Sequence, residues 1–176
     1  MIMENKRERN FWRYWLGGLL MLAAMIVMNN WLTNDISPWG IRDHQSAASA
    51  MRVDAIQNAW AAAGVLDLAR VSIVIDLIYI AVYSFGAYCG GWIFAGHTNS
   101  GLKKLGWLIV IAAVILAIAD YTETICQFIQ ALQFKGNDVL AKIAAIAQPI
   151  KSLAFLTTFL GVLAALFMRR IANRRA

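Results

Sequence analysis

Residues 105–131 read LGWLIVIAAVILAIADYTETICQFIQA, an apolar run that carries Asp120 and Glu123 near its end. Such a run is long enough to cross the hydrocarbon core of a bilayer, roughly 30 Å thick, as a helix. A carboxylate in hydrocarbon costs at least about 2.5 kcal/mol on insertion scales, so partners or protonation must offset the pair. These two acids are therefore the first place to look for function.

The rest of the composition agrees with a membrane location. Of the 176 residues, 60% are hydrophobic and 15% are charged, and a soluble domain could not cover so much apolar surface. Because no segment alternates as a barrel strand would, the apolar runs are expected to be helices. They lie at about 12–32, 71–95, 105–131 and 144–168. We predict an all-α polytopic membrane protein, residues 1–176 forming one membrane domain of four antiparallel transmembrane helices.

The basic residues predict the orientation. They cluster before the first run, between the second and third, and after the fourth: Lys6, Arg7, Arg9, Arg13, Lys103, Lys104, Arg169, Arg170, Arg174 and Arg175. By the positive-inside rule both termini are cytoplasmic. Basic tails beside spanning helices face anionic lipid, so the net charge of +6 does not indicate nucleic acid. The first run, flanked by Trp12 and Trp31, is expected to be a permanent span rather than a cleaved signal peptide.

The Cys and His positions in the sequence do not indicate a metal site, a disulfide or a cofactor site. Cys89 and Cys126 are expected near opposite membrane surfaces, too far apart to bridge. His97 lies in a short polar loop without a second His or Cys nearby. We expect no metal and no cofactor, and no Ser-His-Asp set suggests a hydrolase. Catalytic residues are not predicted, although an enzyme using paired carboxylates as acid and base stays open.

The segment 33–70, on the outer side, is expected to contain an amphipathic helix. Residues 46–63 are Ala-rich with interspersed polar residues, and Gly64 is expected to end the helix. Two placements stay open, a helix lying on the outer surface or a cap over the mouth of the bundle. Asn29 and Asn30, where the first span exits, either cap that interface or reach into a site between helices.

Polar side chains fall on single faces of the second and third spans. Asp76, Tyr79 and Tyr83 are separated by offsets of three and seven, which places them on one helix face. In the third span the face consists of Asp120, Glu123, Gln127 and Gln130. Gly86 and Gly90 form a Gly-x-x-x-Gly spacing that permits close helix contact, either within the bundle or in a dimer.

The fourth span adds Lys151, with Pro149 expected within its first turns. At about 1.5 Å per residue, Asp76, Asp120, Glu123 and Lys151 all lie roughly 8 to 16 Å below the outer surface. We therefore predict one ligand- or ion-binding site. Its residues are Asp76, Tyr79, Tyr83, Asp120, Glu123, Gln127 and Lys151.

Three acids against one base leave a formal charge of −2 on this cluster. One or two acids then hold protons, or Arg70 or a bound cation completes the balance. The functional hypothesis is binding or conduction of a proton, a small cation, or a lipid-like ligand such as a quinone. The alternative is a structural or accessory subunit whose polar network only fixes helix packing. The sequence does not identify a protein partner, and the expected neighbour of the chain is the lipid bilayer.

The same residues resemble a family of small bacterial four-span membrane proteins. The resemblance rests on Val53 to Trp60, Ile75 to Tyr83, Ala119 to Glu123, and Ile150-Lys151. It implies an outer amphipathic segment, an Asp and Tyr in the second span, Asp-x-x-Glu in the third and Lys early in the fourth. Thr124 departs from the family pattern, which has Asn there. The resemblance implies a location in the inner membrane of a bacterium, an architecture and a residue set, and no reaction.

Overall fold

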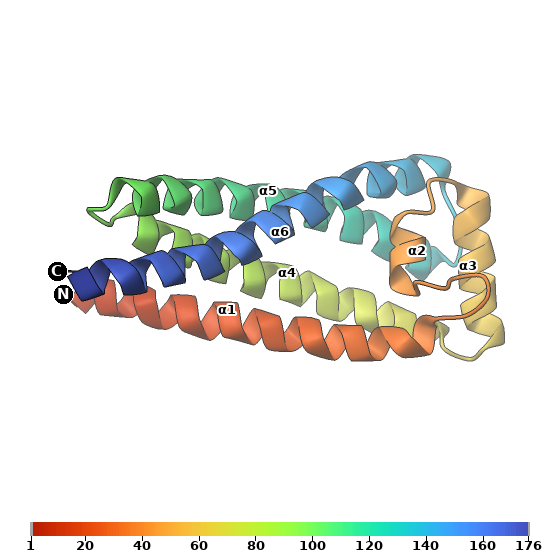
Figure 1. Ribbon diagram of the computed structural model, residues 1–176. Helices are drawn as coiled ribbons and strands as arrows, with labels where there is room; N and C mark the ends of the chain where they lie inside the picture. The colour runs from red at the N-terminus through yellow and green to blue at the C-terminus, as the bar shows by residue number, and fades with distance from the viewer. Residues whose placement is uncertain (1, 176) are drawn as a thin grey trace. The chain divides into compact units, whose positions relative to one another are not determined.

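The protein is helical throughout its described part. The computed structural model describes the backbone of residues 2–175 and the side chains of residues 6–172, and no strand occurs among them. In chain order the elements are α1 (Ile2–Asn29), the 3₁₀ turn η1 (Asn30–Leu32), α2 (Ile41–Gln45), α3 (Ala50–Ala62), α4 (Leu66–Ala95), α5 (Ser100–Gln133) and α6 (Asp138–Arg175) (Figure 1). Of these, α1, α4, α5 and α6 are long and apolar enough to cross a membrane. The predictions of an all-α protein and of four helices long and apolar enough to span a membrane are confirmed.

The long helices extend beyond the predicted apolar runs because polar residues cap them outside the hydrocarbon. Asn99 accepts the Leu102 backbone N–H through its side-chain oxygen, and Asn137 accepts those of Val139 and Leu140. One expectation is wrong as a result. Since α6 begins at Asp138, Pro149 lies well inside the helix rather than in its first turns. There it leaves the Ala145 carbonyl without its usual intrahelical donor.

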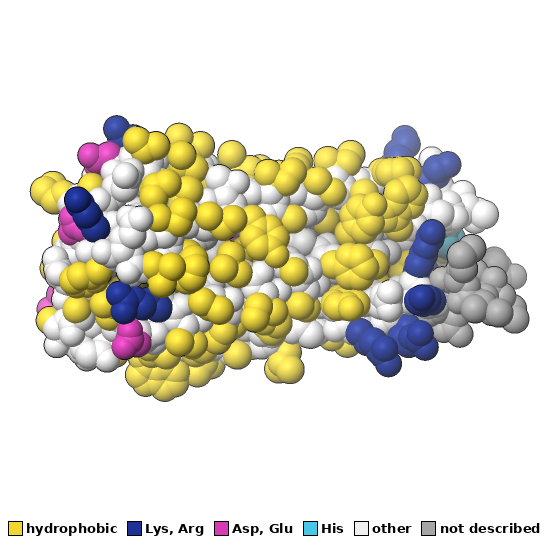
Figure 2. Space-filling model, turned by 180° about the vertical axis from the view of Figure 1, so that it is seen from behind, with side chains coloured by type: hydrophobic (Ala, Val, Ile, Leu, Met, Phe, Trp, Pro, Cys, Tyr) yellow, Lys and Arg dark blue, Asp and Glu magenta, His cyan; other side chains and the backbone are white. Residues whose placement is uncertain are grey.

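The chain forms two compact units that each contain parts of several helices. Unit 1 comprises Met1–Leu19, Ala81–Ala117 and Lys151–Ala176, and unit 2 comprises Leu20–Ile80 and Ile118–Ile150. Unit 1 contains eleven Lys and Arg residues and two Glu residues, so its formal charge is +9. Unit 2 contains five Lys and Arg residues and eight Asp and Glu residues, so its formal charge is −3. In Figure 2 the Lys and Arg side chains of unit 1 gather at its end, beside the atoms drawn in grey. The prediction of a single membrane domain stays a prediction.

Close packing between helices holds unit 1 together. A Cβ on Gly86 would stand 2.8 Å from the Trp15 Cα, so α1 and α4 approach as closely as backbones can. On another face of α4, Gly91 meets Gly106 of α5, where a Cβ on Gly91 would stand 2.9 Å from the Gly106 oxygen. Phe11 and Trp15 stack at 5.7 Å and Trp15 also stacks on Phe159 at 6.4 Å. The glycine spacing of α4 is therefore used within the chain.

In unit 2, α2 and α3 lie at the ends of the four long-helix segments, with α3 running across them (Figure 1). Trp60 of α3 is fully buried with Leu32, Ile56 and Ala69, and its indole N–H donates to the Leu32 carbonyl at 2.8 Å. Asn29 holds the start of α2, because its side chain accepts from Ile41 N–H and donates to the Trp39 carbonyl. This contact agrees with the capping role expected for Asn29.

Both ends of α3 follow from its sequence. Ser49 accepts the Arg52 backbone N–H as N-cap. Gly64, at φ 71°, lets the Val65 N–H reach back to the Trp60 carbonyl at 2.9 Å. The helix is thus slightly shorter than the predicted 46–63, and Gly64 ends it as expected. Two acids fasten α3 to the α5–α6 loop, Asp138 accepting from Ala50 N–H and Asp54 from Gly136 N–H.

Candidate functional site

The helices α4 and α5, both long and apolar enough to cross a membrane, meet through a polar contact in unit 2. Thr124 of α5 donates from Oγ1 to Oδ2 of Asp76 of α4 at 3.1 Å, and both side chains are buried. One helical turn away, the Tyr121 hydroxyl donates to the Leu77 carbonyl at 3.1 Å. A carboxylate that accepts a buried hydroxyl proton is partly compensated for its removal from water. Asp76 is therefore held in place from α5.

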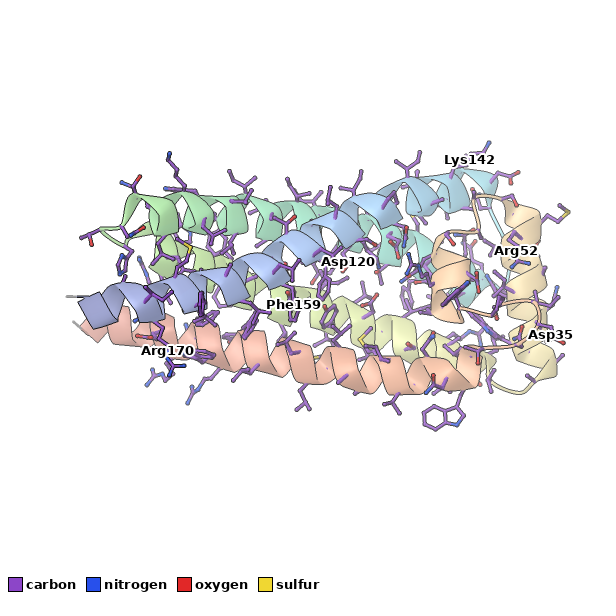
Figure 3. All side chains as sticks on the ribbon, viewed as in Figure 1. Asp35, Arg52, Asp120, Lys142, Phe159 and Arg170 are labelled. Carbon is purple, nitrogen blue, oxygen red and sulfur yellow. The ribbon has the colours of Figure 1, made fainter. Side chains whose placement is uncertain are left out.

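The polar face predicted for α5 points inward. Asp120 is 4% exposed, Glu123 0% and Gln127 1%, whereas Ile118 and Ile125 on other faces are 65% and 47% exposed. Figure 3 labels Asp120 on this helix. The face also includes Leu116, which is buried one turn before Asp120. A periodicity of three and four residues is thus sufficient to place the acids inside.

Gln127 is the residue on this face whose buried amide lacks hydrogen-bond partners among the described residues. Among the described residues, neither its side-chain nitrogen nor its side-chain oxygen has a hydrogen-bond partner. A buried polar group left unsatisfied costs about 1 to 3 kcal/mol. Gln130, one turn further on, differs because it donates to the Cys126 carbonyl and accepts from Asn137 N–H. Gln130 therefore shapes the α5–α6 loop, while Gln127 presents a donor and an acceptor to the interior.

Arg70, considered above as a charge partner for the cluster, is engaged elsewhere. Its Nη1 lies 2.9 Å from Oδ1 of Asp67, and its Nε donates to the Ala131 carbonyl at 3.1 Å. Asp67 itself is largely exposed. The described residues show no group of three or more His, Cys, Asp or Glu side chains that could hold a metal ion. Arg70 thus contacts Asp67 and the end of α5 rather than the acid cluster.

The predicted site residues are divided between the two units. Asp76, Tyr79, Asp120, Glu123 and Gln127 belong to unit 2, where all five are buried. Tyr83 and Lys151 belong to unit 1. The Tyr83 ring is fully buried against Phe155 at 5.2 Å, and its hydroxyl is 3.3 Å from Thr158 Oγ1. Lys151, at the junction of the units on α6, is half-buried.

A second polar cluster, which the sequence did not suggest, lies beneath α3. His44 of α2 is 2% exposed, stacks on Trp60 at 5.5 Å, and places its Nε2 3.1 Å from Nε2 of Gln57. Burial lowers the pKa of His44 to about 4, so its ring is neutral at pH 7. The remaining polar atoms, His44 Nδ1 and Gln57 Oε1, have no partner among the described residues.

Thr124 is the site residue that sequence reasoning missed. Its signal was present, because Thr124 follows Asp120 by four residues and therefore lies beside it on the helix. The hydroxyl now has a role of its own as the donor to Asp76.

In comparisons with protein-family models, with curated proteins and with solved structures, none matches this chain. The site therefore has to be interpreted from its own geometry.

Proposed function

We propose that the inward face of α5 binds the polar head of a membrane-borne ligand, such as a quinone in its quinol form or a lipid with a hydroxyl group. The observation that carries this proposal is Gln127, whose buried amide offers both a donor and an acceptor without a partner among the described residues. A ligand head group that both accepts and donates would complete those bonds. Glu123, one turn away and fully buried, lies on the same face.

The acids in this region favour an exchange of protons when the ligand binds. Unit 2 places Asp76, Asp120 and Glu123 within its helices, and its Arg70 is held by Asp67 and the Ala131 carbonyl. A proton on one carboxyl group removes a charge that hydrocarbon penalises and turns that group into a donor. Lys151, also within the spans, is the basic residue that we propose as a further charge partner.

The finer architecture belongs to the same proposal. The chain is taken as an antiparallel four-helix bundle in a bacterial inner membrane, with both termini cytoplasmic and α3 as an amphipathic helix on the outer side. The charge of +9 on unit 1, which holds both termini, against −3 on unit 2 supports this orientation. The ion pair of Arg169 with Glu8, 2.9 Å between Nη1 and Oε1, brings the terminal parts of α6 and α1 to one end of unit 1.

Native mass spectrometry of protein purified in mild detergent tests the binding proposal. We expect an added ligand mass on the wild-type protein and its loss in Gln127→Leu. Gln133→Leu is the matched control, because Gln133 is exposed on the same helix and its variant should keep the mass. A wild-type spectrum without any bound small molecule, or equal retention in both variants, would contradict the proposal.

The second candidate is the structural network, and two contacts favour it. Thr124 to Asp76 and Tyr121 to the Leu77 carbonyl both tie α5 to α4 at fixed register. These two contacts do not involve Gln127, Asp120 or Glu123. The network and the ligand site can therefore be tested on different residues.

A further inference from the structure

Unit 1 contains a groove that the acid cluster does not involve. It has a volume of about 280 Å³ and is lined by Arg7 of α1 and by Tyr88, Cys89 and Trp92 of α4. All four residues belong to unit 1. The groove thus combines a guanidinium group, two aromatic rings with polar atoms, and a thiol.

The charges around this groove select an anion. The basic residues of this part of α1, Lys6, Arg7, Arg9 and Arg13, are all exposed, and among them Arg7 lines the groove. The neighbouring acid, Glu8, is 2.9 Å from the Arg169 guanidinium and so is already paired. With a formal charge of +9, unit 1 attracts an anionic group, and a guanidinium suits a phosphate because it can donate two parallel hydrogen bonds.

The surroundings of the groove identify the anion as part of a lipid. Trp92 is 36% exposed, lies 6.2 Å from the Tyr88 ring and 4.9 Å from that of Trp107. Phe85, one turn before Tyr88 on α4, is 45% exposed. Trp and Tyr gather where head groups meet hydrocarbon, and an exposed apolar face beyond them suits an acyl chain. A free phosphate would use the guanidinium alone, whereas a phospholipid uses the whole groove.

We propose that this groove binds an anionic phospholipid, with Arg7 contacting the phosphate, Tyr88 and Trp92 contacting the head-group and glycerol region, and an acyl chain lying along Phe85. Cys89, which lines the same groove, is 9% exposed, and the lipid covers this remaining surface. This proposal is independent of the ligand proposed for Gln127, because its residues lie in the other unit and carry the opposite charge.

Cys89 supplies the readout. With Cys126→Ala as the background, Cys89 is the one thiol in the chain. Its rate of modification by methyl methanethiolsulfonate is measured in phosphatidylcholine vesicles and in a series of vesicles with increasing fractions of phosphatidylglycerol, up to equal parts of the two lipids. We expect phosphatidylglycerol to slow the reaction. Arg7→Gln should weaken this protection about fivefold, measured as the lipid fraction that gives half of the effect.

Arg9→Gln is the matched control, since it removes the same charge from an exposed position two residues away that does not line the groove. It should keep the protection. Equal effects of the two substitutions would show a diffuse surface charge and overturn the site, as would equal labelling rates in the two kinds of vesicle. Protection by inorganic phosphate in phosphatidylcholine vesicles would overturn the lipid assignment. Native mass spectrometry showing retained phosphatidylglycerol on wild type and Arg9→Gln, but not on Arg7→Gln, would support it.

Discussion

The Thr124 hydroxyl donates to Oδ2 of Asp76 across 3.1 Å, joining α5 to α4 through a buried carboxyl group. Its donor, the Thr124 hydroxyl, can be replaced by a methyl group with little change in side-chain volume. It therefore allows the structural part of the polar network to be tested apart from the proposed ligand site.

Thr124→Val should destabilise the protein. The substitution replaces the hydroxyl by a methyl group and leaves a buried carboxyl group without this donor, which costs about 1 to 3 kcal/mol. Thermal unfolding in detergent measures the loss. Thr124→Ser, which keeps the hydroxyl, should lose less than the valine variant. If the two variants unfold alike, the bond does not stabilise the fold.

Asp120→Asn and Glu123→Gln should have little effect on stability, or should increase it. Charged side chains in a ligand-binding site often lower the stability of the ligand-free fold, so replacing them by neutral amides should remove that destabilisation. A network that fixes helix register instead predicts a loss of about 3 to 5 kcal/mol when one charged partner is removed. Unfolding of both variants in ligand-free detergent, with Thr124→Val measured alongside, distinguishes these outcomes.

Acidification should loosen the packing of α2 and α3 through His44. Its folded pKa of about 4 lies below the ordinary value of 6.5, so the unfolded state binds more protons between these values. Stability is then complete above about pH 6.5, decreases as the pH falls toward 4, and the total loss is about 3 kcal/mol. Across this pH range, the free energy of unfolding of His44→Gln should depend less on pH than that of the wild-type protein. His97→Asn, at the other histidine of the chain, is the control and should keep the wild-type slope.

Asp54→Ala should release the start of α3 from the α5–α6 loop. The variant leaves the Gly136 N–H without its acceptor, and we expect a loss of about 1 kcal/mol together with faster amide exchange in residues 50–62. Hydrogen exchange followed by mass spectrometry locates the effect. Asp35→Ala, in the exposed turn before α2, is the matched control and should leave exchange in α3 unchanged. Equal exchange in both variants would mean that the loop does not hold α3.

Gly86→Ala should disrupt the contact of α4 with α1. The new methyl group would meet the backbone of Trp15, and such overpacking costs about 1 to 3 kcal/mol. Gly17→Ala is the control, because its methyl group would meet only the Val82 side chain at 3.8 Å. Thermal unfolding of both variants checks the difference. A Gly86→Ala protein as stable as Gly17→Ala would show that the helices can separate there without cost.

The four long apolar helices could be predicted because a helix in a bilayer must be apolar over the thickness of the hydrocarbon core. Such apolar runs are visible in the sequence. Their ends could not, since Asn99 and Asn137 act as caps in polar segments that hydropathy does not distinguish from loops. The inward face of α5 followed from its periodicity. Thr124 was missed because a helical Thr hydroxyl can equally bond its own helix, as Thr122 does to the Ile118 carbonyl at 2.8 Å.

The cluster beneath α3 lay further from what a sequence can show. His44 is buried because Trp60, sixteen residues later, stacks on it, and neither residue stands in a pattern that predicts the other. The predicted meeting of Lys151 with the acids depended on matched depth alone, and that of Tyr83 depended on its helical offset of seven from Asp76. Those two residues belong to unit 1, so their distance from the acids stays a prediction.

The fastening of α3 also affects how the protein is made. Asp138 lies 88 residues after Ala50 in the chain, and Gly136 lies 82 residues after Asp54. Neither bond can form until the ribosome has synthesised all of α5 and the loop that follows it. Throughout that interval the N-terminal turn of α3 lacks both attachments, and it is then that an insertion chaperone or a protease has the most access to residues 50–62.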